Sequence, residues 1–257
     1  MSQLALTLLA AALYAAAVLR VRRRRGTVDV LRAVSFATGI ALLLVAFLSP
    51  LDRLGEERYF SAHMAQHLLI GDLAPLFCVL GLNGPLLRPA LALRPVRTLR
   101  VLAHPLVALP LWAVDICLWH VAPLYDAALD HDAVHALQHL LFFTCGALLW
   151  AALLELLPGP RWFRLPHRLA YVGVMWLVSL TLSQIFMWSG HVYYARYGDR
   201  LDDQRVGGGI MLLEGSFVMI SLVAWLLWRE LQPESSSTAS VDQPKSLAPQ
   251  GVPSSGS

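Results

Sequence analysis

Long apolar runs, nearly free of charge, constrain this chain more than any other feature. A helix needs about 20 residues to cross roughly 30 Å of hydrocarbon, and seven stretches approach that length. Lipid offers no water to pair backbone groups, so only helices or closed barrels can span it, and no alternating strand pattern is present. The sequence therefore predicts an all-α, polytopic membrane helix bundle with seven transmembrane helices, at residues 2–20, 30–49, 62–82, 104–122, 133–156, 167–189 and 206–229.

The composition supports lipid as the main solvent. Charged residues make up 14% of the chain and hydrophobic residues 57%, whereas a soluble domain carries roughly 25% charged residues. The last stretch, 231–257, is instead rich in Ser, Pro and Gln and cannot bury a core. We expect a transmembrane domain over 1–230, followed by a disordered cytoplasmic tail over 231–257.

The basic residues predict the orientation. If the N-terminus lies outside, fifteen of the 20 Lys and Arg residues fall on the inner face, as the positive-inside rule requires. The run Arg22–Arg25 follows the first apolar stretch rather than preceding it, which favours an uncleaved span over a signal peptide or a nucleic-acid site. We expect a multi-pass protein of the bacterial cytoplasmic (inner) membrane, with its C-terminus cytoplasmic, the lipid bilayer as a partner and no nucleic acid.

Two histidine pairs share one local motif. The pattern H-x-x-Q-H-L-L occurs at 63–69 and again at 135–141. A spacing of four places both side chains of a pair on one helical face. The third and fifth predicted spans run in the same direction, so both pairs reach similar depths. His63, His67, His135 and His139 are therefore predicted to form a four-imidazole site near the outer face, where polar groups inside a span are usually functional.

The residues near these pairs favour copper as the metal. Imidazole suits copper, zinc, iron and nickel, and a thioether shifts the preference towards Cu(I). Met64 adjoins His63, and His120 lies near the outer end of the fourth span. Met187 and Met211, also near outer ends, are better explained as packing residues, His191 as solvated and His131 as a ligand or a helix-initiating residue. Our predicted metal ligands are His63, His67, His135, His139, His120 and Met64.

Three acids lie inside predicted spans: Asp72, Asp115 and Glu214. A charged group at mid-membrane costs about 2.5–3.5 kcal/mol on insertion scales, so these acids should face the bundle interior. They are candidates for supporting the metal ligands or handling protons, and hydrogen bonding between helices is an equal alternative. Asp72, five residues after His67, should not share the histidine face. Zincin, nucleophile-elbow and phosphate-loop motifs are missing, so no enzyme is predicted.

The middle third of the chain, and more loosely the whole helical body, resembles the CtaG-type cytochrome c oxidase assembly family, the multi-span membrane proteins and not the single-span copper-delivery protein of the same name. The similar stretches are SAHMAQHLLIGDLAPLFCVLG at 61–81 and 104–150, where LWHVAPLYDAAL leads into HALQHLLF. The resemblance implies a role in building the copper site of a haem–copper oxidase. It implies the copper-bearing oxidase subunit as partner, with copper delivered or the apo subunit held.

Other functions remain open from the sequence. Stacked histidines on facing helices also suit bis-imidazole haem ligation. The intramembrane acids would suit a proton or ion transporter. A scaffold whose histidines only hydrogen-bond helices together is a fourth possibility.

Overall fold

The computed structural model describes residues 2–24, 26–94 and 100–232, and within these ranges the protein is helical without strands. Most of the predicted tail, together with Arg25, Arg97 and Lys245, lies outside the described residues. The helices that make up the spans are α1 (Ser2–Arg23), α2 (Val30–Leu48), α4 (Phe60–Leu68), α5 (Ala74–Gly81), α8 (Pro105–Trp119), α10 (Asp132–Leu153), α11 (Leu165–Trp188) and α12 (Leu201–Leu231). The remaining elements are α3 (Pro50–Glu57), η1 (Leu69–Leu73), α6 (Gly84–Leu91), η2 (Arg100–Ala103), α9 (Ala122–Asp130) and η3 (Ala195–Tyr197).

Six helical segments in the described residues are long and apolar enough to cross a membrane, and α8 with α9 makes a seventh if the pair counts as one span. The 15 residues of α8 reach only about 22 Å at 1.5 Å per residue. The chain then bends by 75° into α9. The predicted all-α fold is confirmed for the described residues, and six of the seven predicted spans are matched by helices long and apolar enough to cross a membrane. The fourth predicted span falls on the short, bent pair α8 and α9.

The third span is continuous but changes its winding halfway. It consists of α4, the π-helical turn η1 and α5. Pro75 has no backbone N–H to donate to the carbonyl four residues earlier, and the wider π turn lies just before it. Such turns often occur at functional sites, and this one carries Asp72.

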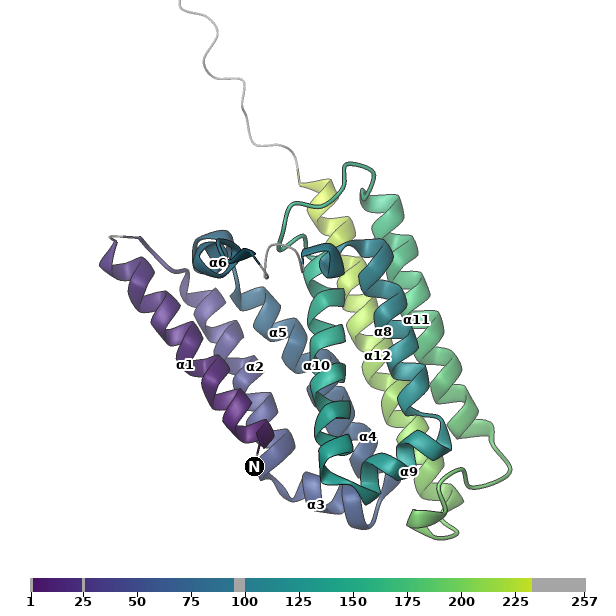
Figure 1. The fold of residues 1–257 in the computed structure, drawn as a ribbon. Helices are drawn as coiled ribbons and strands as arrows, with labels where there is room; N and C mark the ends of the chain where they lie inside the picture. The colour runs from purple at the N-terminus through teal and green to yellow at the C-terminus, as the bar shows by residue number, and fades with distance from the viewer. Residues whose placement is uncertain (1, 25, 95–99, 233–257) are drawn as a thin grey trace, which may run out of the picture.

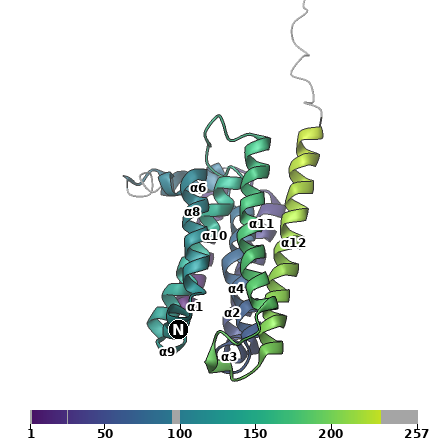
Figure 2. The same cartoon turned by 90° about the vertical axis from the view of Figure 1, so that its right-hand side faces the viewer.

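The two ends of the bundle differ. Figures 1 and 2 show α3 and α9 lying across one end, while α6 lies at the opposite end. We call the first the α3/α9 end. The first residue of α1 lies at the α3/α9 end and the last residue of α12 at the other (Figure 1), as an odd number of spans requires. Which end faces outwards stays a prediction.

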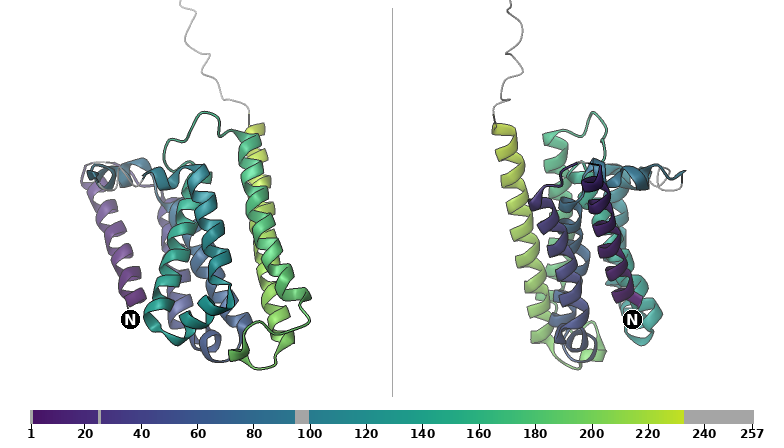
Figure 3. Two further views of the ribbon diagram at one scale, coloured as in Figure 1. Left: turned by 45° about the vertical axis from the view of Figure 1, so that its right-hand side comes forward. Right: turned by 90° about the vertical axis from the view of Figure 1, so that its left-hand side faces the viewer.

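Helix α10 lies at the centre and contacts η1, α5, α8 and α9, whereas α1 stands at the edge beside α2 (Figure 3). The close crossing of α10 and the third span depends on glycine: a Cβ added at Gly146 would lie 2.1 Å from the carbonyl oxygen of Gly71. Large apolar side chains, including Leu149, Trp150 and Met175, fill the core towards the α6 end. These contacts fix the depth of α4 relative to α10.

Candidate metal centre

Four histidine rings pack together where α4 and α10 run side by side near the α3/α9 end. Along each helix, the ring centroids are 4.1 Å apart for His63 and His67 and 4.2 Å apart for His135 and His139. Across the helices, His63 lies 5.5 Å from His135, and His67 lies 5.4 Å from His139. The four predicted imidazoles therefore form one buried cluster.

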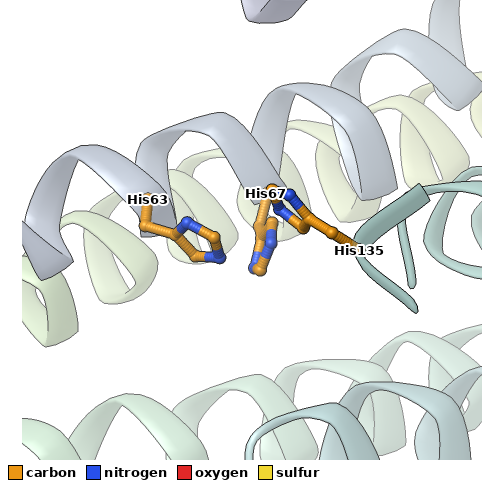
Figure 4. Close-up of side chains that lie close together, drawn as sticks. All are labelled: His63, His67 and His135. Carbon is orange, nitrogen blue, oxygen red and sulfur yellow. The ribbon is translucent and has the colours of Figure 1, made fainter. Parts of the chain in front are cut away.

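Three of these rings present nitrogen atoms to a common point. One ring nitrogen each of His63, His67 and His135 lies within 4.8 Å of the other two, and Figure 4 shows the rings pointing towards one another from two helices. His139 packs against this group and also lines a cavity of about 240 Å³ between α1, α2 and α10. The geometry suits three nitrogen ligands with His139 beside them.

Seven of the eight ring nitrogens in the cluster have no hydrogen-bond partner among the described residues. Both ring nitrogens of His63, His67 and His139 are buried without a hydrogen bond, and so is Nε2 of His135. The backbone of Gly55 adjoins His63 but not in hydrogen-bonding geometry. An unsatisfied buried polar group costs about 1–3 kcal/mol, so such groups need an explanation. The donor set fits a borderline or soft transition-metal ion.

Glu56 orients one of the histidines. The Nδ1 atom of His135 lies 3.0 Å from Oε1 of Glu56, whereas Nε2 of the same ring is buried without a hydrogen-bond partner. The hydrogen bond from His135 lowers the pKa of the Glu56 carboxyl, against the raising effect of burial. A carboxylate behind a histidine is a common arrangement around metal ligands, since it fixes the tautomer and ring orientation.

The short helix α3 brings Glu56 to the cluster. Ser49 caps its start by accepting a hydrogen bond from the N–H of Leu51, and Pro50 suits the first turn. The helix can approach α4 closely because residue 55 is glycine: a Cβ there would lie 2.9 Å from backbone atoms of His63. Neither this helix nor the role of Glu56 was predicted from the sequence.

The glutamines of the two motifs differ in their surroundings. Gln66 donates to the carbonyl of Ala46 at 3.1 Å and to Asp52 Oδ1 at 2.6 Å, which ties α4 to α2 and α3. Gln138 is equally buried, but its amide has no partner. Since Asp52 and Glu56 lie four apart on α3, one face of this helix supports both motifs.

His120 approaches from the end of α8. Its Nδ1 lies 2.6 Å from the carbonyl of Ile116, its Nε2 has no partner, and its ring centroid is 6.3 Å from that of His67. The carbonyl of His120 accepts a hydrogen bond from Tyr194 at 2.7 Å, and Tyr194 stacks on Tyr125. His120 thus borders the four-ring cluster without joining the three convergent nitrogens.

Two further tyrosine contacts hold the α3/α9 end together. The hydroxyls of Tyr125 and Tyr197 are 2.8 Å apart, and Tyr197 donates to the carbonyl of Gly55 at 2.8 Å. Tyr125 also lies against His63, with ring centroids 5.2 Å apart. Sequence reasoning did not identify these tyrosines, whose positions far apart along the chain carry no spacing signal.

A small cavity of about 50 Å³ lies just deeper than the cluster, between α4, η1, α8, α10, α11 and α12. Its lining includes His67, Met64 and Asp72 from the third span. Asp72 accepts a hydrogen bond from Nε1 of Trp150 at 2.8 Å, and the Glu214 carboxyl lies beside it. The cavity lining is Met64, His67, Leu68, Gly71, Asp72, Trp112, Ile116, His120, Phe142, Ser179, Met211 and Glu214.

The remaining candidates lie elsewhere. Asp115 is buried beside Cys145 of α10 and does not line this cavity. His131 is exposed at the start of α10, and His191 is exposed in the loop after α11. Met187 packs against Gly208 of α12. The structure thus brings all six predicted metal ligands to one region, together with two of the three acids.

Comparisons with known proteins place the chain in a family. Residues 12–232 match the cytochrome c oxidase caa3 assembly factor family. Uncharacterized proteins of Mycobacterium bovis and Mycobacterium tuberculosis are each 27% identical over 249 residues, covering 84% of this chain and 36% of their own length. One of Mycobacterium leprae is 28% identical over 186 residues, covering 64% of this chain and 27% of its own length. The chain therefore spans about a third of the length of the curated relatives it matches.

No solved structure matches the chain. The family match covers most of the helical body, from within α1 to the end of α12, and includes the histidine cluster and the cavity. It agrees with the resemblance found in the sequence. The chain belongs to the cytochrome c oxidase caa3 assembly factor family.

Proposed function

We propose that this protein is a non-enzymatic assembly factor that binds copper in the cluster between α4 and α10 and supplies it to the copper-bearing subunit of an oxidase in the bacterial cytoplasmic membrane. The family supports the oxidase as the partner. The copper, the subunit and the direction of transfer are the proposed parts.

The observation that carries the proposal is the convergence of one ring nitrogen each from His63, His67 and His135, in a cluster where only Nδ1 of His135 has a partner among the described residues. Glu56 holds the far nitrogen of His135, the arrangement expected behind a metal ligand. Three protein ligands leave a coordination position open to an incoming ligand, as in metal sites that exchange or activate what they bind. An open position suits transfer to a partner better than permanent storage.

Donor chemistry favours copper among the metals that imidazole binds. The thioethers of Met64 and Met211 line the adjoining cavity, and thioether donors select Cu(I). The acidic side chains at the α3/α9 end, among them Asp126, Asp130 and Asp132, would raise the local concentration of cations.

The alternatives have less support. Small-molecule pockets usually measure about 300 Å³ or more, so the 50 Å³ cavity beside His67 and His120 gives no room for haem. A scaffold held by histidine hydrogen bonds does not explain ring nitrogens without partners. A proton or ion transporter would use Asp72 and Glu214, but the family match favours assembly.

Copper analysis of the purified protein tests the proposal. The wild-type chain should retain copper after dialysis, and the His63→Gln, His135→Gln double variant should lose the copper held by three imidazoles. His104→Gln, His167→Gln is the matched control, because both of those histidines lie at the opposite end. Equal copper in all three proteins would contradict the proposal, provided each elutes as a folded species on size exclusion.

A further inference from the structure

The cavity beneath the histidine cluster has the donors of a second metal position. Met64 and Met211 come from different helices, α4 and α12, and both line it. Their side chains are 1% and 5% exposed. Two methionines lining one small cavity offer it soft thioether donors, whereas the three convergent ligands are all imidazoles.

Two imidazoles line the same cavity. His67 is 7% exposed and has two unpaired ring nitrogens. For His120, the hydrogen bond at Nδ1 leaves Nε2 as the unpaired nitrogen. His67 belongs both to the three convergent nitrogens and to the cavity lining, so a metal ion could move between the two places while this ligand stays bound.

The charges in the cavity favour a cation. Among its lining residues, the acids Asp72 and Glu214 are accompanied by no lysine or arginine. Both Glu214 oxygens are buried without a hydrogen bond in good geometry. Carboxyl oxygens near the thioethers would offset the charge of a cation in a site otherwise lined by apolar groups. A volume of about 50 Å³ admits a single ion with little water.

We propose that the cavity is a second, Cu(I)-selective position with Met64, Met211, His67 and His120 as its donors. The proposal rests on the copper-binding function given above. Copper enters at the three imidazoles and passes inward by ligand exchange, with His67 common to both positions and no change in oxidation state. The deeper position holds Cu(I) out of contact with water, and the outer one presents it to the partner.

Replacing the two thioethers separates this position from the outer one. Met64→Leu with Met211→Leu removes both sulfurs at nearly constant volume, a change that cores usually tolerate. Met175 and Met219 provide the matched control, because they are also 1% and 5% exposed but lie in the core towards the α6 end. His63→Gln with His135→Gln removes outer ligands and leaves the four inner donors.

The experiment is an anaerobic titration of each purified full-length chain with Cu(I) against a chromogenic Cu(I) chelator, followed by X-ray absorption of the loaded protein. Wild type and the Met175→Leu, Met219→Leu control should bind two equivalents and show copper–sulfur scattering. The Met64→Leu, Met211→Leu protein should bind one equivalent with nitrogen ligands only. The His63→Gln, His135→Gln protein should bind one equivalent that retains sulfur.

The outcomes distinguish this inference from the proposed function. A single wild-type equivalent with nitrogen ligands only, unchanged by Met64→Leu and Met211→Leu, would overturn the second position and leave the three-imidazole site standing. A wild-type protein that binds a single, sulfur-ligated equivalent, with the same stoichiometry in the His63→Gln, His135→Gln protein, would support the cavity and contradict the outer site. A wild-type protein that binds no copper would overturn both.

Discussion

The unpaired ring nitrogens are the most informative residue-scale feature of this protein. Buried histidines in a helix bundle ordinarily form hydrogen bonds to neighbouring helices, because a buried ring nitrogen without a hydrogen bond destabilises the fold. Here His63, His67 and His139 leave both nitrogens unpaired inside the bundle. These three rings and that of His135, which has one unpaired nitrogen, pack with neighbouring centroids 4.1–5.5 Å apart. A bound ligand would satisfy the unpaired nitrogens.

The carboxylate behind His135 gives a prediction for one residue. Glu56→Gln removes the negative charge that orients the ring, and losing such a partner commonly lowers metal affinity 10–100-fold. Glu57→Gln is the matched control, since the ion pair of Glu57 among the described residues is with Arg53, at 3.6 Å on an exposed part of the same helix. We expect about a tenfold or larger loss of copper affinity for Glu56→Gln alone, measured by chelator competition. Equal affinities in the two variants would remove Glu56 from the site.

Spacing predicted the two histidine ladders, and the structure places them face to face. A separation of four fixes which side chains share a helical face, so the ladders could be recognised in the sequence. Glu56 was not recognised because its partner His135 comes much later in the chain, on another helix. Tyr125, Tyr194 and Tyr197 likewise meet only through the fold. Asp72 was predicted to lie off the histidine face; it bonds Trp150, but it also lines the same cavity as His67.

At the scale of elements, apolar length predicted the spans well. The predicted spans 30–49 and 167–189 differ from α2 and α11 by at most two residues at either end. Length alone could not reveal the 75° bend between α8 and α9 or the π turn within the third span. Both depend on local backbone pairing and on prolines, which a hydropathy pattern does not register.

The crossing of α10 over the third span gives an element-scale prediction. Gly146→Ala would place a Cβ 2.1 Å from the carbonyl oxygen of Gly71, which must push the helices apart. Overpacking of this kind costs about 1–3 kcal/mol. Gly173→Ala is the control, since a Cβ there meets nothing within 4 Å.

Thermal unfolding in detergent should therefore show a lower Tm for Gly146→Ala and an unchanged or slightly higher Tm for Gly173→Ala, because alanine favours a helix over glycine. Because α10 carries His135 and α4 carries His67, the same change should weaken copper binding. A Gly146→Ala protein with wild-type Tm would mean that the two helices are not packed as closely as described.

At the scale of the whole molecule, the arginine distribution predicts that the α3/α9 end faces outwards. In a variant without Cys78, Cys117 and Cys145, a cysteine at position 132 should react with a membrane-impermeant thiol reagent on intact cells. A cysteine at position 159, in the loop at the opposite end, should react only after lysis. The reverse pattern would place the copper cluster on the cytoplasmic side.

The orientation matters because the proposed partner must reach the cluster. Glu56, Tyr125 and Tyr197 close the α3/α9 end around the histidines, so a copper-accepting subunit would approach there. The chain spans about a third of the length of its curated relatives. The family assignment rests on the helical body alone.

The central claim is that the histidine cluster supplies copper to an oxidase, and the metal content of that oxidase tests it most directly. The enzyme should be purified from cells whose only copy of this protein carries His63→Gln and His135→Gln, and its copper-to-haem ratio compared with that from cells carrying His104→Gln and His167→Gln. We predict that the oxidase from the first cells is depleted of copper but not of haem, and that the oxidase from the second cells carries its full complement of copper. A full complement of copper in both, with the variants present in the membrane at equal levels, would contradict it.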